Sequence, residues 1–423
     1  MNDLITIFED RKVKLDLTKE QQQDILALKG SVYESQYLNL QVDGTLLMQH
    51  YVGFVVRNKT RIQILPKIYN DGLTKGKEEA SESMELLFKM LSYSGFIDIR
   101  EIPEPQKIVK YNNDILEVFI SIFIERFLKL ITSDVYRKYE TMVDNMQFIK
   151  GKILFSESIK KNTFKNHLHY VEYEEFTVNT TLNRIFKTVI LRLINETKSS
   201  ENMKKLKLAL VYLEDIDIIR LSKELFDSIR FNRLNLKYEP VFKLVKLFYY
   251  NYQPGFKEGD ENTFTFLVPL NKLFEYFVYK ILSEHDFNFD GNVCHVEYQK
   301  PQQYLASLDN SGVFTLKPDI TIMNKNKVLV IVDAKYKNPI YNGEVLISHA
   351  DVYQMLAYGV HYNCRFIYLV YPFFKGHKKE SQIAEYKIKT VTGDFIIRVI
   401  QVDIMDKNID KIKDELYEIV RMS

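Results

Sequence analysis

Three charged residues in the last third of the chain have the types and spacing that metal-assisted hydrolysis needs. Asp319 follows Pro318 at the start of a short apolar segment, and Asp333 and Lys335 end an apolar run that begins at Val328. A short run rich in β-branched residues is typical of a buried central strand. Because side chains alternate between the two faces of a strand, Asp333 and Lys335 are predicted to project to the same side.

A polar turn at residues 324–327 predicts a hairpin that brings Asp319 beside Asp333. Two carboxylates, the backbone carbonyl of Ala334 and water would form a hard-oxygen site, which suits Mg²⁺, or Mn²⁺, better than Zn²⁺. Lys335 could then hold the attacking water or a phosphate. If Asp333 and Lys335 are considered alone, the alternative is a non-catalytic role, as a solvated strand end or a surface ion pair.

A second polar group follows the apolar run. Asp351, Gln354 and Tyr358 are spaced by three and four residues, which places them on one face of a predicted helix that Gly359 could cap. This face could meet a metal-bound water or a DNA backbone, and it could equally be exposed to solvent.

The order Pro-Asp, hairpin, apolar strand and Asp-x-Lys resembles the core of the PD-(D/E)xK nuclease superfamily. Nucleases of this class often carry one more metal-facing carboxylate on the helix before the core. Residues 267–282 have helical apolar spacing, and Glu275 lies off the strongest apolar line. Glu275 is therefore the candidate for that extra ligand, and a solvated helix glutamate is the alternative.

The chain also resembles the McrC family, the nuclease subunits of McrBC modification-dependent restriction systems and their LlaJI-like relatives. The similarity runs along most of the chain, through Val52–Val56, Ile62–Ile68, Lys150–Ile153, Glu174–Thr177, Leu182–Arg184, Leu273–Glu275 and the Pro-Asp/Asp-Ala-Lys core. It implies a McrB-like AAA+ GTPase hexamer as partner, because the amino-terminal part of McrC proteins inserts into the centre of the McrB ring and stimulates it. It also implies double-stranded DNA as the substrate.

Composition sets bounds on these expectations. With 423 residues and 46% hydrophobic content, the chain can bury more than one core. A net charge of +2 requires any DNA-binding surface to be local. The two cysteines are far apart, which argues against a disulfide framework or a zinc module and favours the cytoplasm. The most apolar helix, residues 115–131, carries four charged residues, so no membrane span is expected.

The predicted fold class is α+β with several domains. Residues 1–135 are predicted to form a β-rich and helical partner-binding domain, residues 136–258 a helical middle region, and residues 259–423 an α/β nuclease core with a mixed sheet. Within the middle region the pattern weakens between Tyr136 and Tyr170, where lysines alternate with aromatic residues. This stretch could follow a DNA backbone, and a solvated linker explains it as well.

The function predicted from these residues is Mg²⁺-dependent cleavage of DNA. Asp319 and Asp333 would be metal ligands with the Ala334 carbonyl, Lys335 would orient water or phosphate, Glu275 would add a ligand, and Gln354 would orient a group at the site. No Walker loop ending in Lys-Ser/Thr is present, so GTP hydrolysis would belong to a partner. Two alternatives remain: a non-catalytic activator and clamp of the GTPase ring, and a stand-alone repair nuclease of the same superfamily.

Overall fold

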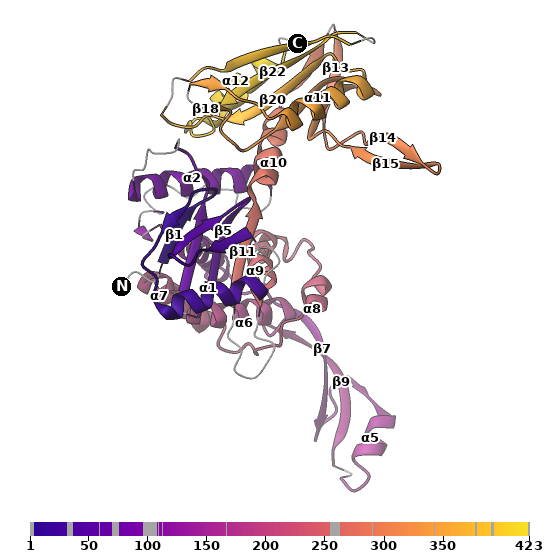
Figure 1. Ribbon diagram of the computed structural model, residues 1–423. Helices are drawn as coiled ribbons and strands as arrows, with labels where there is room; N and C mark the ends of the chain where they lie inside the picture. Colours follow the sequence, from indigo (N-terminus) through magenta and orange to yellow (C-terminus); the bar gives the residue numbers. More distant parts are fainter. Residues whose placement is uncertain are drawn as a thin grey trace. The chain divides into compact units, whose positions relative to one another are not determined.

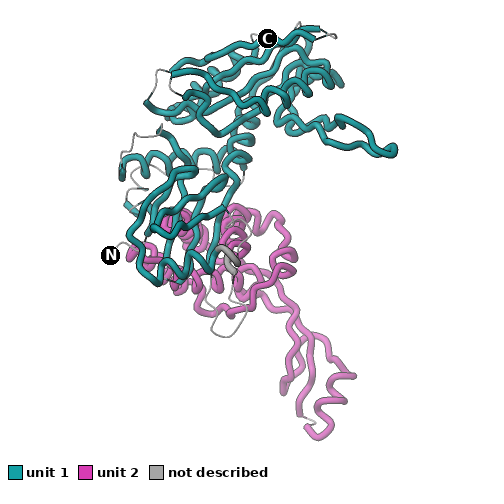
Figure 2. Tube along the Cα trace, viewed as in Figure 1, with its two compact units in different colours: residues 1–115, 253–423 teal, residues 116–252 magenta. Residues whose placement is uncertain are grey.

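The computed structural model describes residues 4–31, 37–58, 60–69, 76–95, 108, 110–111, 113–165, 167–253, 263–289, 291–341, 343–376, 379–390 and 393–421. The chain divides into two compact units (Figure 2). Unit 1 combines residues 1–115 with residues 253–423, and unit 2 consists of residues 116–252. The first and last parts of the sequence therefore share one unit.

The amino-terminal part of unit 1 is built on a sheet in which β1 (Leu4–Phe8), β6 (Thr60–Leu65), β5 (Tyr51–Arg57) and β11 (Thr263–Pro269) are neighbours in that order. β5 and β6 pair antiparallel and form a hairpin. β11 pairs with β5 along its whole length, although some two hundred residues separate them in sequence. Gly53 permits this pairing, because a Cβ there would lie 1.9 Å from the Phe266 carbonyl oxygen.

The remaining elements of this part cover and extend the sheet. Three short strands, β2 (Val13–Lys14), β4 (Thr45–Met48) and β3 (Leu38–Leu40), form a second small sheet. Helix α1 (Lys19–Ser31) packs beside this small sheet, whereas α2 (Lys77–Ser94) packs against β6. Two acidic residues in the first turn of α2 stabilise its start at Lys77 through the helix dipole.

Unit 2 is mostly helical, as the sequence predicts. Its helices are α4 (Ile115–Ile131), α5 (Phe155–Lys161), α6 (Thr181–Glu196), α7 (Ser200–Tyr212), α8 (Lys223–Ser228), η2 (Leu236–Tyr238) and α9 (Glu239–Tyr250), and β10 (Tyr252–Gln253) follows them. The buried Glu117 carboxylate joins three of these helices. It accepts hydrogen bonds from Thr197 Oγ1 at 2.6 Å and from Asn202 Nδ2 at 2.8 Å.

Residues 138–177, which overlap the stretch where the helical pattern weakens, are mainly strand and not helix. β7 (Lys138–Met146), β9 (His169–Thr177) and β8 (Lys152–Ile153) form a three-stranded antiparallel sheet there (Figure 1). Most side chains of β7 are exposed or partly exposed on both faces. Without a buried face, the sequence lacks the apolar alternation from which strands are predicted.

The carboxyl-terminal part of unit 1 is a seven-stranded mixed sheet in the order β12-β13-β16-β17-β20-β22-β21. The strands are β12 (Phe287–Phe289), β13 (Asn292–Tyr298), β16 (Ile320–Asn324), β17 (Lys327–Ala334), β20 (Phe366–Pro372), β21 (Gln382–Ile388) and β22 (Phe395–Val402). β16 pairs antiparallel with β17, whereas β17, β20 and β22 run parallel. The predicted mixed sheet is therefore present.

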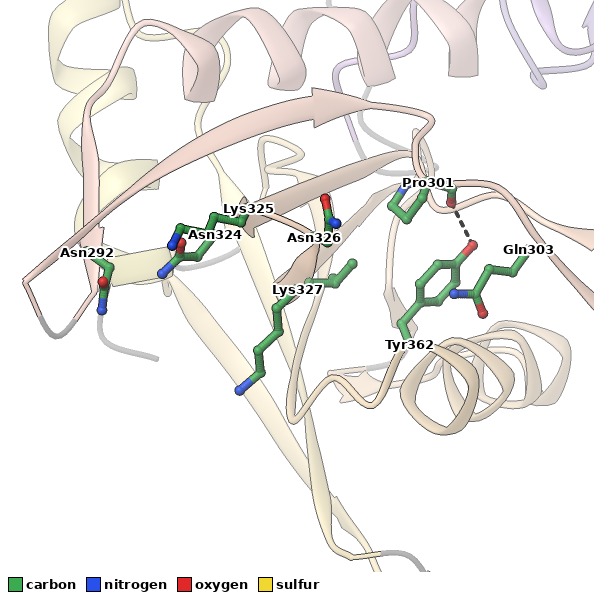
Figure 3. Close-up of a pocket in the computed structure, with 9 residues that line it drawn as sticks. Asn292, Pro301, Gln303, Asn324, Lys325, Asn326, Lys327 and Tyr362 are labelled. Carbon is green, nitrogen blue, oxygen red and sulfur yellow. Dashed lines mark hydrogen bonds between the residues drawn. The ribbon is translucent and has the colours of Figure 1, made fainter.

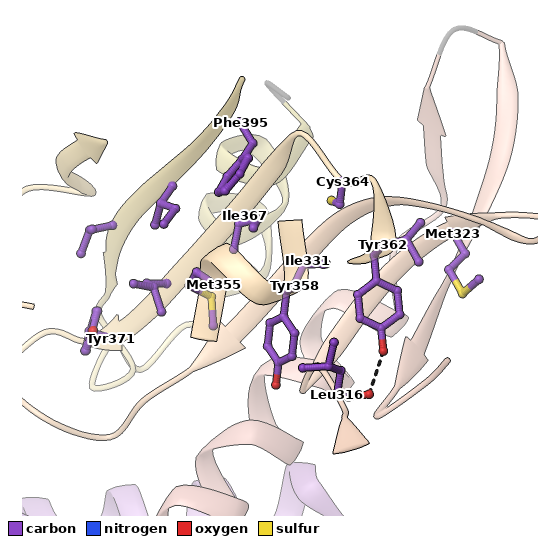
Figure 4. Packing of buried hydrophobic residues seen from close by; sticks show 14 residues of the cluster. Leu316, Met323, Ile331, Met355, Tyr358, Tyr362, Cys364, Ile367, Tyr371 and Phe395 are labelled. Atoms are coloured by element: carbon purple, nitrogen blue, oxygen red, sulfur yellow. Dashed lines mark hydrogen bonds between the residues drawn. The ribbon is translucent and has the colours of Figure 1, made fainter. Parts of the chain in front are cut away.

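Three helices accompany this sheet: α10 (Leu270–Ser283), α11 (His349–Tyr362) and α12 (Ile409–Arg421). Met355, Tyr358 and Tyr362 of α11 pack into the apolar core shown in Figure 4. The helix expected from residue 267 begins only at Leu270, because residues 267–269 are paired with β5 as the end of β11.

Two small hairpins project from this sheet. β14 (Gln303–Leu308) pairs with β15 (Ser311–Leu316), and β18 (Ile340–Tyr341) pairs with β19 (Glu344–Val345). β15 therefore belongs to the β14–β15 hairpin, whereas β16, which follows it in sequence, belongs to the seven-stranded sheet.

Among the described residues, no helix is long and apolar enough to cross a membrane. Cys294 and Cys364 are both buried and free.

Glu9→Gln is expected to stabilise the protein at alkaline pH. Burial raises the pKa of Glu9 to about 7, although His50 N donates a hydrogen bond to Glu9 Oε1 at 3.1 Å. A carboxyl group with a raised folded-state pKa contributes less stability as the pH rises from its unfolded pKa through the folded one. Glutamine keeps the acceptor and cannot ionise, so the variant should gain at most roughly 3 kcal/mol at pH 8.

Unfolding measured at pH 4.5 and pH 8 tests this expectation. The two proteins should be equally stable at the lower pH, where Glu9 is protonated in the folded state. Equal stability at pH 8 as well would contradict the prediction.

Candidate functional site

The β16–β17 hairpin brings Asp319 and Asp333 together. Ile320 is paired with Val332. Asp319, the residue before β16, and Asp333, the penultimate residue of β17, therefore meet at one end of the hairpin. The backbone N–H of Ala334 donates a hydrogen bond to Asp319 Oδ2 at 3.1 Å. The pairing that the sequence predicted thus places both carboxylates at the same strand end.

Lys335 lies on the same side of the strand as Asp333, as strand alternation requires. Its Nζ is 2.6 Å from Asp333 Oδ2. The Asp333 side chain is 1% exposed, and its Oδ1 has no hydrogen-bond partner within the described part of the chain. A buried, unpartnered carboxylate oxygen is costly unless a cation or another donor completes it.

Glu275 joins these residues from helix α10. Its side chain is buried, and Lys272 Nζ approaches its Oε2 to 2.7 Å. Tyr298 OH and Gln299 Nε2 each lie 3.4 Å from the same oxygen. Glu275 is therefore not a solvated helix glutamate, and its charge acts on both Asp319 and Asp333.

The polar face of α11 divides between two roles. Lys335 Nζ donates to Gln354 Oε1 at 3.3 Å, Gln354 Nε2 donates to Tyr358 OH at 3.0 Å, and Tyr358 OH donates to the Lys317 carbonyl at 3.1 Å. This chain of hydrogen bonds ties the Lys335 ammonium to the backbone two residues before Asp319. Asp351 instead pairs with Lys337.

The electrostatics of the site follow from three acids and two lysines, with Lys335 beside Asp333 and Lys272 beside Glu275. Burial raises the pKa of Asp319 well above its usual range, and the charges of Asp333 and Glu275 add to the effect. Burial also raises the pKa of Asp333, although Lys335 opposes it. For Lys335, burial alone would lower the pKa, but the neighbouring carboxylates outweigh it and raise the pKa. The ammonium is therefore held in its charged form.

Gln299 is a residue of this site that the sequence did not indicate. It follows β13, and its backbone N–H donates to the Asp319 carbonyl at 2.8 Å while its side chain approaches Glu275. Its φ of 52° lies in the left-handed region, which is uncommon for glutamine. Nothing in the local pattern marks it, because its role depends on which strand β13 joins.

Two surface cavities lie away from these carboxylates. One, of about 690 Å³, is lined by Asn292, Pro301, Tyr362 and the turn of residues 324–327 (Figure 3). The other, of about 570 Å³, adjoins it and is lined by residues at the starts of β17, β20 and β22. Because the active-site candidates lie at the far end of β17, neither cavity belongs to the carboxylate site.

The fold has a counterpart among restriction proteins. A chain in the solved structure of a half-complex from a tetradecameric assembly of Thermococcus gammatolerans McrB AAA+ hexamers with bound McrC has the same fold. The TM-score is 0.75 at 21% identity, covering 99% of this chain and 100% of that chain. The Type IV methyl-directed restriction enzyme EcoKMcrBC of Escherichia coli (strain K12) is 21% identical over 283 residues, which are 64% of this chain and 79% of that protein.

A family model described as "McrBC 5-methylcytosine restriction system component" matches residues 46–372. The chain belongs to this family, and the resemblance to McrC drawn from its sequence is confirmed.

Asp319→Asn is expected to stabilise the protein when divalent cations are removed. The raised pKa of Asp319 means that ionising it in the folded protein is unfavourable, so stability falls as the pH rises from its unfolded pKa through the folded one. Asparagine keeps an oxygen that can accept from Ala334 N and carries no charge. Thermal unfolding in EDTA should show a midpoint a few degrees higher for the variant at pH 8, with the difference shrinking towards pH 4. A lower midpoint at pH 8 would contradict the proposed electrostatic cost.

Proposed function

We propose that this chain is the nuclease subunit of a GTP-driven, McrBC-like restriction system and hydrolyses phosphodiester bonds of foreign, modified double-stranded DNA. The observation that carries the proposal is the cluster of Asp319, Asp333 and Lys335 at one end of the β16–β17 hairpin, with Glu275 beside it. The order of these residues along the mixed sheet supports a PD-(D/E)xK nuclease core.

The residues present fit a Mg²⁺ ion, or Mn²⁺ in its place. Asp319 and Asp333 offer hard oxygens, and Asp333 Oδ1 is buried without a hydrogen-bond partner among the described residues. No three His, Cys, Asp or Glu side chains in the described part are arranged as a metal cage. Mg²⁺ needs no such cage, because it is commonly held by one or two carboxylates and several waters. The Ala334 carbonyl and Glu275 would complete the set.

When bound, the ion would act as a Lewis acid. It would offset negative charge on the phosphodiester and lower the pKa of a bound water molecule. Lys335 stays protonated beside Asp333, so it donates to the phosphate or to the water and does not act as a general base. Gln354 orients the Lys335 ammonium, and Tyr358 holds Gln354 in turn.

The same proposal assigns a McrB-like AAA+ GTPase hexamer as partner. It is supported by the fold shared with a chain from an assembly of McrB AAA+ hexamers with bound McrC. Residues 1–135 would serve partner binding and residues 136–258 would form a middle region. Residues 259–423 would carry cleavage.

The alternative of a non-catalytic activator cannot be tested by truncating the chain near Tyr252. Such a fragment lacks β11, which pairs with β5 through all seven of its residues. The exposed edge of β5 would destabilise the amino-terminal sheet and expose it to aggregation. Point substitutions in the intact chain separate cleavage from stimulation without this damage.

Asp333→Ala is expected to abolish cleavage and leave GTPase stimulation unchanged. Removing a group that only hydrogen-bonds to a metal ligand already lowers activity or metal affinity about tenfold to hundredfold, so losing a ligand itself should lower the cleavage rate by more than about a hundredfold. The assay compares methylated and unmethylated plasmid with Mg²⁺, with and without the partner GTPase and GTP. Asp394→Ala is the matched control, because Asp394 is an exposed aspartate at the opposite end of the same sheet.

Wild-type cleavage rates in the Asp333→Ala variant would rule out the assignment. Cleavage by the chain alone, without partner or GTP, would instead favour a stand-alone nuclease. GTPase stimulation without any cleavage by the wild-type protein would favour the activator.

A further inference from the structure

A two-stranded arm, β14–β15, leaves the carboxyl-terminal sheet beside the carboxylate site. The outgoing chain is fixed at Gln299, whose N–H donates to the Asp319 carbonyl at 2.8 Å. The returning chain ends β15 at Leu316, three residues before Asp319. Both ends of the arm are thus joined to the backbone of a residue that the proposed nuclease site uses.

The base of the arm is held firmly. The Tyr362 hydroxyl lies 2.7 Å from the Pro301 carbonyl oxygen and 2.8 Å from that of Leu316, so it bridges the outgoing and returning chains (Figures 3 and 4). Further out, the Tyr304 ring lies where a side chain of residue 312 would be. A Cβ on Gly312 would be 2.3 Å from Tyr304 Cδ2. The arm is therefore an ordered ribbon with a packed cross-strand contact.

The arm presents large apolar side chains to solvent. Tyr304, Leu305, Leu308 and Phe314 are 54%, 46%, 64% and 73% exposed. Strand alternation places Tyr304 and Leu308 on one face and Leu305 on the other. A ribbon with apolar groups on both faces suits insertion into a slot better than docking on a flat surface.

The charges are arranged around the base of the arm. From Gln303 to Leu316 the only side chain that is charged at neutral pH is Asp309, at the tip. Lys317 follows directly, is exposed, and forms no ion pair with any described residue. Lys300 precedes the arm and is 70% exposed, with its Nζ 3.7 Å from Glu297 Oε2. The cations thus flank the ribbon and leave its length uncharged.

Duplex DNA matches this distribution. Its phosphates run along both rims of a groove, whereas the groove floor offers base edges and the methyl groups of thymine. A major groove about 12 Å wide admits a two-stranded β-ribbon. At the tip, Asp309 could accept from cytosine and Asn310 could bond adenine.

We infer that the β14–β15 arm enters a groove of the duplex substrate, with Lys317 and Lys300 on the flanking phosphates. The inference rests on the proposed nuclease function and extends it, because it names the surface that holds the duplex beside Asp319. A second copy of this chain is the competing occupant of an apolar ribbon. The flanking cations and the attachment to the site favour DNA.

The test measures binding of a fluorescein-labelled 30-base-pair duplex by the full chain, made inactive with Asp333→Asn, between 50 and 200 mM KCl. Substituting Tyr304, Leu308 and Phe314 together with serine should weaken binding at least fivefold without changing its salt dependence. Lys317→Ala should lower the slope of log K against log salt by about 0.9, and Lys317→Arg should restore it. Val293→Ser is the matched control, because Val293 is 77% exposed on β13 of the same sheet. It should bind as the parent does.

A folding defect is separated by a second variant. Phe314 has a φ of 55°, which glycine adopts without strain. Phe314→Gly therefore removes the ring while favouring the same backbone, and it should weaken binding with an unchanged unfolding midpoint.

Unchanged DNA binding by the triple serine and Phe314→Gly variants would overturn the inference. Sedimentation of the same samples identifies the competitor: loss of a dimer with intact DNA binding would assign the arm to a second copy. The nuclease proposal fails separately. If the wild-type chain cleaves plasmid and the arm variants bind DNA normally, only the inference about the arm is rejected. If the wild-type chain does not cleave and the arm variants bind DNA more weakly, only the nuclease proposal is rejected.

Discussion

The register between β16 and β17 is the constraint on which the site depends. Pairing Ile320 with Val332 sets Asp319 against the end of β17, and the Ala334 N–H bond to Asp319 Oδ2 fixes that position. A slip of one residue would reverse the faces of β17 and take Asp333 and Lys335 away from the carboxylate of Asp319. The register is secure because both strands are central and their apolar side chains are buried.

The site concentrates negative charge that the fold does not neutralise by itself. Asp319, Asp333 and Glu275 act on one another in a buried setting; Lys335 pairs with Asp333, and Lys272 pairs with Glu275. The hydrogen bonds from Lys335 through Gln354 to Tyr358 keep that ammonium in place. This arrangement costs stability in the absence of a cation, which is a common property of sites shaped for binding one.

Contacts between distant parts of the sequence hold unit 1 together around the site. Tyr336, directly after Lys335, is buried and donates its hydroxyl to the Lys67 carbonyl at 2.9 Å. Lys89 of α2 donates to the carbonyls of Ile404 and Asp406, ahead of α12. With β11 in the amino-terminal sheet, the strand that bears Asp333 is packed within a unit that includes both ends of the chain. The residue that follows Lys335 is therefore held by a residue 269 positions earlier in the sequence.

The sequence alone determined the hairpin, the mixed sheet, the helices of unit 2 and the candidates at the site, because each is encoded in local periodicity and residue type. It could not place Glu275 or Gln354, whose alternatives were solvated faces, because helix periodicity does not say which sheet edge a polar face meets. Tertiary structure decided these positions by packing α10 and α11 beside β17. It also decided the strands of residues 138–177, the place of β11 and the role of Gln299. These features depend on pairing with segments that are not adjacent in sequence. The free energy of such pairing is therefore not reflected in the local sequence pattern.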